Sequence, residues 1–159
     1  MKAEQTKTNI EVARRFLEEF IGKNNQSVAD ETVDEAVEVS TGLKTDGPIR
    51  GLKDYKQILA ALFDAFPDMD FNLTDIFASE DGNKVVGTFT ASGTHKGEMY
   101  GIAPTNRRIT MSETHVLTFR DGKIVHNLVG GNNPLEFEML FAPVLAPIVL
   151  PGIEQTYGK

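Results

Sequence analysis

The chain has 159 residues and carries 16 basic against 23 acidic side chains, which gives a formal charge of −7. This balance, with no Lys/Arg cluster able to follow a phosphate backbone, argues against a nucleic-acid partner. The absence of cysteine excludes disulfides, thiolate metal sites and cysteine nucleophiles. The length favours one domain, residues 1–159, with a sizeable core.

Three helices are predicted in the first half of the chain. A Thr-x-x-Glu capping box at Thr8 precedes apolar residues at helical spacing, which predicts a helix from about Asn9 to Ile21. A similar signal at Ser27 predicts a shorter helix over Val28 to Val37. After a glycine-bearing loop, a third apolar stripe starts at Leu52 and is stopped by a proline at position 67.

The hydrophobic period then changes from helical to two, which predicts strands separated by short turns. Helices followed by a strand meander are typical of an α+β domain with a mainly antiparallel sheet. A further helix is expected after the strands, over Leu135 to Phe141, because Pro134 is well placed to open it. The four predicted strands are Met69 to Ser79, Asn83 to His95, Ile109 to Arg120 and Lys123 to Gly130.

The most apolar segment, residues 140–152, is interrupted by three prolines and is shorter than the ~20 apolar residues that a membrane-spanning helix needs. We therefore expect residues 141–159 to form a tail that packs on its own domain or on a second subunit, with no membrane contact. Charges throughout the first residues also argue against a secretory signal. The expected location is the cytoplasm.

The segment 109–120 places two ionisable side chains on an otherwise apolar strand face. Alternation puts Glu113 and His115 on the same side as Met111 and Leu117. A buried ionisable group loses its hydration, so it must be paired, neutralised or functional. Glu113 is either a general base in an apolar pocket or a structural carboxylate held by Arg14 or Arg15. His115 is either its catalytic partner or a core histidine.

Several motifs resemble one family. The stretch "GTHKGEMYGIAPTNRRI" at residues 93–109, with "FPDMDF" before it and "FRDGKIVHNLVGGN" after it, is similar to the SnoaL-like polyketide cyclase or ester cyclase family of the nuclear-transport-factor-2-like superfamily. The resemblance implies a cone-shaped α+β barrel, in which a strongly curved sheet wraps around N-terminal helices and encloses one deep pocket. It also implies acid/base chemistry without a metal or an organic cofactor, commonly in a dimer.

The end of the last strand departs from the family pattern. The family's "W...D" ending aligns with "LVGGN", which places Leu128 at the Trp and Asn132 at the Asp that usually serves as acid/base. An amide cannot exchange a proton near neutral pH as a carboxylate does. Asn132 is therefore a candidate donor, and the glycines before it make a bulge and a one-residue shift possible.

Other candidates complete the predicted site. The resemblance places His95 at the pocket mouth, although loops at strand ends also carry simple turn residues. Tyr55 could present its hydroxyl to a substrate or belong to the core. Asp68 and Asp70 are more typical of a solvated turn than of a metal site, and with three scattered histidines no metal is expected. The residues expected to contact substrate are Tyr55, Met111, Phe89, Leu117 and Leu128.

Two functions remain open at this level. The first is a cofactor-independent cyclase or isomerase that removes a proton next to a carbonyl in a hydrophobic polyketide- or terpenoid-like metabolite, with Glu113 or His115 as base. The alternative is a binding or dimer-scaffold protein, in which the replacement of the family's Asp by Asn132 indicates that catalysis was lost. The Thr-rich outer face of segment 109–120 and the apolar tail predict a two-fold homodimer.

Overall fold

A computed structural model describes residues 2–42, 44 and 46–131. The chain begins with α1 (Lys2–Arg15), which continues without a break into a π-helical turn, η1 (Phe16–Ile21). The helix predicted over Asn9 to Ile21 is confirmed, but its predicted start is wrong. Thr8 lies inside α1, where its hydroxyl donates to the Glu4 carbonyl at 3.0 Å instead of capping an N-terminus.

The second predicted helix is only half correct. Helix α2 (Gln26–Thr32) ends five residues early, and the chain continues as strand β1 (Val33–Ser40). The valines of this segment fit a strand, and β1 pairs in parallel with a strand almost ninety positions further along the chain. Because that partner is so distant in sequence, local capping and spacing did not predict the strand. The short β2 (Ile49–Arg50) then pairs with β1.

The third helix and the four later strands are confirmed, with small shifts at their ends. Helix α3 (Leu52–Ala65) stops before Pro67, and its last carbonyl accepts hydrogen bonds from the backbone N–H groups of Lys96 and Gly97 at 2.9 and 3.0 Å. A Cβ on Gly97 would lie 2.2 Å from the Asp64 carbonyl oxygen, so this close approach requires glycine. The strands are β3 (Asp70–Ala78), β4 (Lys84–Thr94), β5 (Arg108–Arg120) and β6 (Lys123–Gly131).

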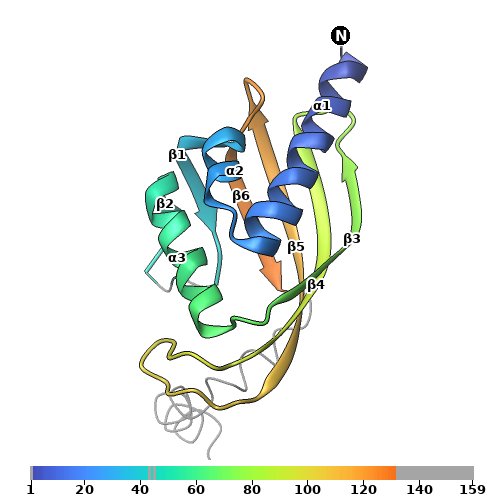
Figure 1. Cartoon of the computed structure of the whole chain (residues 1–159). Helices are drawn as coiled ribbons and strands as arrows, with labels where there is room; N and C mark the ends of the chain where they lie inside the picture. Colours follow the sequence, from blue (N-terminus) through green and yellow to red (C-terminus); the bar gives the residue numbers. More distant parts are fainter. Residues whose placement is uncertain (1, 43, 45, 132–159) are drawn as a thin grey trace, which may run out of the picture.

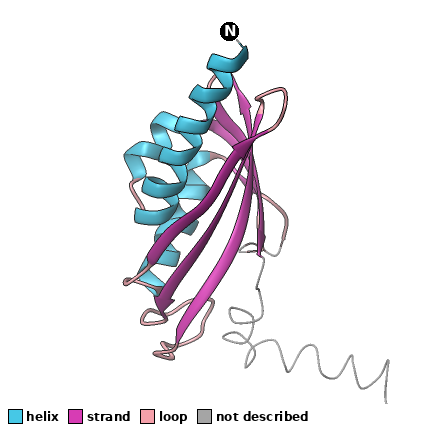
Figure 2. Ribbon diagram, turned by 90° about the vertical axis from the view of Figure 1, so that its right-hand side faces the viewer, coloured by secondary structure: helices cyan, strands magenta, loops and turns pink. Residues whose placement is uncertain are grey.

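The strands form one six-stranded sheet in the order β2-β1-β6-β5-β4-β3. All neighbouring pairs are antiparallel except β1 and β6, so the sheet is mixed. It is strongly twisted and curved but open, with β6 and the long β5 as its two central strands (Figure 1). The described helices all cover one face, as Figure 2 shows, and none of them lies on the other face. The expected α+β class with a mainly antiparallel, curved sheet is confirmed.

The core lies between the helices and the inner face of the sheet. Phe16, Leu17 and Phe20 of η1 are completely buried, and so are Val85 of β4 and Leu117 of β5. Aromatic and branched side chains from both layers form one continuous cluster, whose removal from water stabilises the packing of the helices on the sheet. This packing fixes the helices above β5, the strand that carries the candidate site.

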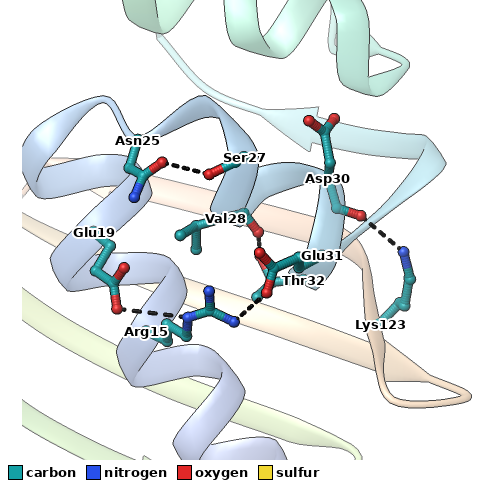
Figure 3. A network of polar contacts seen from close by, with 9 residues as sticks. All are labelled: Arg15, Glu19, Asn25, Ser27, Val28, Asp30, Glu31, Thr32 and Lys123. Atoms are coloured by element: carbon teal, nitrogen blue, oxygen red, sulfur yellow. Dashed lines mark hydrogen bonds and ion pairs between the residues drawn. The ribbon is translucent and has the colours of Figure 1, made fainter.

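A surface network attaches α2 to its neighbours (Figure 3). Arg15 forms ion pairs with Glu19 and Glu31, while the Lys123 ammonium donates to the Asp30 carbonyl at 3.0 Å. These contacts tie α2 to the end of α1 and to the start of β6. Since the Arg15, Glu19 and Glu31 side chains are partly exposed, solvent screens these ion pairs and they add little to stability.

The predicted helix over Leu135 to Phe141 and the apolar tail lie outside the described residues. Within the described part of the chain, no helix is long and apolar enough to cross a membrane.

Candidate functional site

Strand β5 supplies the centre of the candidate site. Its predicted alternation is confirmed, because Met111, His115 and Leu117 are 9%, 3% and 0% exposed while their neighbours in sequence face outward. Glu113 belongs to the same inner face, yet its side chain remains 28% exposed. Its cross-strand partner on β6 is Gly131, which carries no side chain that could cover the carboxylate. One carboxylate on an otherwise buried face therefore stays accessible.

The two ionisable groups of β5 contact each other. The His115 Nε2 atom lies 3.4 Å from the Glu113 Oε2 atom, a long contact that joins the buried imidazole to the more exposed carboxylate. The ring of Phe89, on β4, packs against the imidazole with ring centroids 5.1 Å apart. The imidazole of His115 is thus buried against Phe89, and each of its nitrogens has one polar neighbour.

The second nitrogen of His115 contacts Asn127, a residue that no pattern in the sequence predicted to be part of the site. The Asn127 side-chain N–H groups lie 3.0 Å from His115 Nδ1 and 2.9 Å from the Tyr55 hydroxyl oxygen. Asn127 is completely buried, and its Oδ1 atom has no partner in the described part of the chain. The four residues Glu113, His115, Asn127 and Tyr55 form a continuous polar chain through the core, which we call the buried polar chain.

A bulge explains why Asn127 escaped prediction. Phe119 pairs with Ile124, but the next pair along is Thr118 with His126, so one residue of β6 is extra. The extra residue reverses the alternation: Asn127 and Val129 turn inward, whereas Leu128 turns outward and is 49% exposed. The glycine doublet had suggested a bulge nearer the strand end, and no local signal marked the observed position.

Tyr55 reaches the buried polar chain from α3. Its ring packs edge-on against Phe20, with centroids 5.3 Å apart, and lies 6.3 Å from the Phe16 ring, so η1 packs against the ring of Tyr55. Burial raises the pKa of Tyr55 well above its usual value; the hydrogen bond from Asn127 opposes this rise, and the Glu113 charge adds to it. Tyr55 is consequently a neutral phenol over the physiological range, suited to hydrogen bonding and not to proton abstraction.

Arginine does not hold Glu113, contrary to one of the two expectations. Arg14 pairs with Glu18 at 3.4 Å, and Arg15 pairs with Glu19 and Glu31 on the helical surface. The carboxylate instead has the His115 imidazole as its neighbour. Among the described residues, the Glu113 carboxylate therefore has a histidine and not an arginine as its charged or polar neighbour.

His95 lies elsewhere. It follows β4, six residues beyond Phe89, so it is about 20 Å further along the strand direction. Its ring is completely buried against Phe66, with centroids 5.4 Å apart, and its Nδ1 atom accepts a hydrogen bond from the Thr105 backbone N–H at 3.3 Å. Its Nε2 atom has no partner among the described residues. The structure therefore does not bring His95 to Glu113 and His115.

The other predicted residues fall into three groups. Phe89, Met111 and Leu117 share the inner face, and Phe89 touches the imidazole directly. Leu128 is on the outer face, so the structure does not place it beside the buried polar chain. Asn132 lies outside the described residues. In the described ranges, no three His, Asp or Glu side chains converge in a way that could hold a metal ion.

Asp68 proves to be a structural link and not merely a solvated turn residue. Its carboxylate accepts hydrogen bonds from the Thr94 backbone N–H at 2.7 Å and the Thr94 hydroxyl at 2.8 Å. Lys96 and Arg108 approach it at 3.6 and 3.7 Å. The hydrogen bonds from Thr94, aided by the Lys96 charge, lower the pKa of Asp68 to about 2. Asp68 thus connects the end of α3 to the ends of β4 and β5.

The curved α+β sheet, with helices on its inner face and a carboxylate and imidazole between the two layers, defines a protein with the nuclear-transport-factor-2-like fold. The chain belongs to the SnoaL-like polyketide cyclase family, whose model matches residues 11–130. No curated protein matches the chain.

Solved structures support the fold. A protein from Jannaschia sp. CCS1 assigned to the SnoaL-like polyketide cyclases is 19% identical, with a TM-score of 0.73 over 84% of this chain and 90% of the other. A phenazine biosynthesis-related protein from Pseudomonas aeruginosa is 19% identical, with a TM-score of 0.69 over 87% and 88%. IdmH from Streptomyces antibioticus, assigned as a polyketide cyclase, is 22% identical, with a TM-score of 0.66 over 86% and 98%. At these identities the likeness is one of fold.

Proposed function

We propose that this protein is a cofactor-independent cyclase or isomerase that removes a proton next to a carbonyl in a hydrophobic, polyketide- or terpenoid-like metabolite. The observation that carries the proposal is the contact between the buried His115 imidazole and the partly exposed Glu113 carboxylate. Two groups able to take and give a proton meet on an apolar face, where little water competes for the charge that develops in the transition state. Membership of the SnoaL-like polyketide cyclase family supports the same reaction class.

The chemistry needs only these groups. A base takes a proton from the carbon next to the carbonyl, and the C–H electron pair moves into an enolate. In ring closure, the enolate carbon attacks a second carbonyl of the same molecule, a C–C bond forms, and the new alkoxide takes a proton back from the conjugate acid. In isomerisation, the proton returns to a different carbon. Neither route changes the oxidation state overall, so no redox partner is required.

The surroundings of the two groups suit such a substrate. Phe89 and Met111 provide apolar contact area beside Glu113, and the carboxylate is the most accessible member of the buried polar chain. A substrate that contacts Glu113 would also lie close to the His115 imidazole, whose Nε2 atom is 3.4 Å from the carboxylate. These features favour catalysis over the binding or scaffold alternative, which would predict Glu113 held by arginine and His115 facing solvent.

A direct test measures enolisation itself. The wild-type protein should accelerate deuterium uptake from D2O at the carbon next to the carbonyl of bicyclic aryl ketones such as α-tetralone. Glu113→Gln should reduce the rate by about 10²–10⁴-fold because a general acid/base group contributes that much. Glu80→Gln, which makes the same change on an exposed turn, is the matched control. Full exchange activity in both Glu113→Gln and His115→Ala would rule out the proposed chemistry.

We also propose that the protein forms a two-fold homodimer through the outer face of the sheet. Hydroxyl side chains pair across the strands on this face: Ser92 and Thr110 share a hydrogen bond across β4 and β5 at 2.9 Å, and Thr74 and Thr88 share one across β3 and β4 at 2.8 Å. Leu128, 49% exposed, adds an apolar side chain beside its cross-strand partner Val116. A hydroxyl-rich face that carries apolar residues and is not covered by any of the described helices is typical of sheets that pack on another subunit.

A further inference from the structure

We infer that Asn127 is a positioning residue: it holds His115 as the neutral tautomer with its proton on Nε2, so that in the proposed reaction His115 donates a hydrogen bond and Glu113 is the base. The assignment of the two catalytic roles rests on the proposed function. The tautomer itself does not, because it follows from the contacts of the folded protein.

The amide nitrogen of Asn127, and not its oxygen, faces the imidazole of His115. The amide nitrogen has two N–H groups, and both have acceptors, His115 Nδ1 at 3.0 Å and the Tyr55 hydroxyl oxygen at 2.9 Å. Only the carbonyl oxygen is left without a partner among the described residues. The reversed amide would give the oxygen two neighbours but leave both N–H groups buried without acceptors. Since orphaned buried N–H groups are rarer than under-satisfied oxygens, the observed orientation is the favoured one.

The contact with Asn127 determines which nitrogen of the His115 ring carries the proton. A neutral imidazole carries one N–H and one acceptor nitrogen. Because Nδ1 accepts from Asn127, the ring proton must lie on Nε2; a proton on Nδ1 would set one N–H group against another. The Nε2–H group then faces the Glu113 carboxylate at 3.4 Å, where donor meets acceptor. The amide, the imidazole and the carboxylate are thus linked by N–H groups that all point toward Glu113.

The tautomer of His115 decides which of the two groups acts as the base in the proposed reaction. His115 has no free lone pair with which to abstract a proton, since Nδ1 is bonded to Asn127 and Nε2 carries hydrogen. Glu113 has carboxylate lone pairs and the more accessible side chain, 28% exposed against 3% for His115. Glu113 is therefore the group that can take the substrate proton, while His115 fixes the carboxylate and can donate to a developing oxyanion.

Nitrogen-15 NMR of the histidine rings tests this inference without a substrate. At neutral pH the wild-type protein should show a pyrrole-like Nε2 and a pyridine-like Nδ1 for His115, and a coupling across the hydrogen bond between Asn127 Nδ2 and His115 Nδ1. Asn127→Asp replaces the N–H donor by an acceptor, so Nδ1 should become the protonated nitrogen. His95 is an internal control, because its Nδ1 accepts from a backbone N–H and its tautomer should be the same in both proteins.

The NMR results distinguish a wrong role for Asn127 from a wrong reaction. A wild-type His115 with its proton on Nδ1, or an Asn127→Asp variant whose His95 signals are native but whose His115 tautomer is unchanged, would overturn the role of Asn127. If the variant does not fold, the coupling in the wild-type protein decides the question alone. A confirmed tautomer together with an undiminished exchange rate in Glu113→Gln would leave the positioning role intact and refute only the proposed reaction.

Discussion

Gly87 of β4 lies directly across from His115 in the sheet, and Leu17 of η1 occupies the space where a side chain on Gly87 would be. A Cβ built on Gly87 would come within 2.2 Å of the Leu17 Cδ1 atom. The helix can therefore lie this close to the sheet only because the strand has no side chain there. Position 87 sets the distance between the helical layer and the strand pair that carries the buried polar chain.

Gly87→Ala should destabilise the protein by about 1–3 kcal/mol, because Leu17 is completely buried and must shift within a packed core. Gly130→Ala is the matched control on β6, since a Cβ there has no atom within 4 Å. That variant should stay within about 0.5 kcal/mol of the wild type. Urea denaturation of both proteins gives the comparison. Equal free energies of unfolding for the two variants would contradict the close packing of η1 on β4.

Tyr55→Phe should lower stability by about 1–3 kcal/mol, because it leaves one N–H group of the buried Asn127 without an acceptor. The aromatic packing against Phe16 and Phe20 is retained in this variant, so the effect reports the hydroxyl. Tyr100→Phe, at a residue that is 56% exposed, should have a much smaller effect since water can replace the lost group. Thermal denaturation of the two variants measures the difference, and a larger loss for Tyr100→Phe would count against the buried polar chain.

The low pKa of Asp68 predicts that the folded protein loses stability in acid. The folded-state pKa of about 2 is below the usual value for aspartate, so the ionised carboxylate stabilises the fold at pH above about 4. This contribution is lost as the pH falls from about 4 to about 2 and Asp68 becomes protonated in the folded protein. Asp68→Asn cannot ionise and should lack this part of the pH dependence.

The measurement for Asp68 is the free energy of unfolding of both proteins from pH 6 to pH 2. The wild type should exceed Asp68→Asn by a constant amount down to about pH 4, and the two curves should approach each other below it. Asp70→Asn is the control, because Asp70 makes none of the contacts with Thr94, Lys96 and Arg108 that Asp68 makes. A wild-type advantage that persists unchanged at pH 2 would refute the role assigned to Asp68.

Leu128→Lys should shift the protein from dimer to monomer if the outer sheet face forms the subunit interface, because it introduces an unpaired charge in the middle of that face. Gln57→Lys adds the same charge on the exposed helical side and should leave the assembly unchanged. Sedimentation equilibrium at micromolar concentration distinguishes one chain mass from two. A wild-type monomer, or a dimer that persists in Leu128→Lys, would exclude this interface.

Much of the fold was determined by local sequence. The periodicity of α1 with η1 and of α3 is helical because each presents one apolar stripe, and the alternation of β4 and β5 follows from the pleat. These patterns depend only on residues near each other in the chain. They were sufficient to place Glu113 and His115 together on the inner face and to predict the α+β class.

Tertiary structure decided the features that depend on distant partners. Strand β1 forms because β6 pairs with it, and no residue near Val33 signals that partner. The β6 bulge turns Asn127 inward because the register with β5 shifts by one residue between Ile124 and His126, and this pairing cannot be seen in the sequence of β6 alone. Asp68 acquires its partners only when the ends of α3, β4 and β5 meet. Local spacing specifies which face a side chain occupies within one element, whereas pairing between elements decides which polar groups meet there, because contacts between distant segments form only when the whole chain folds.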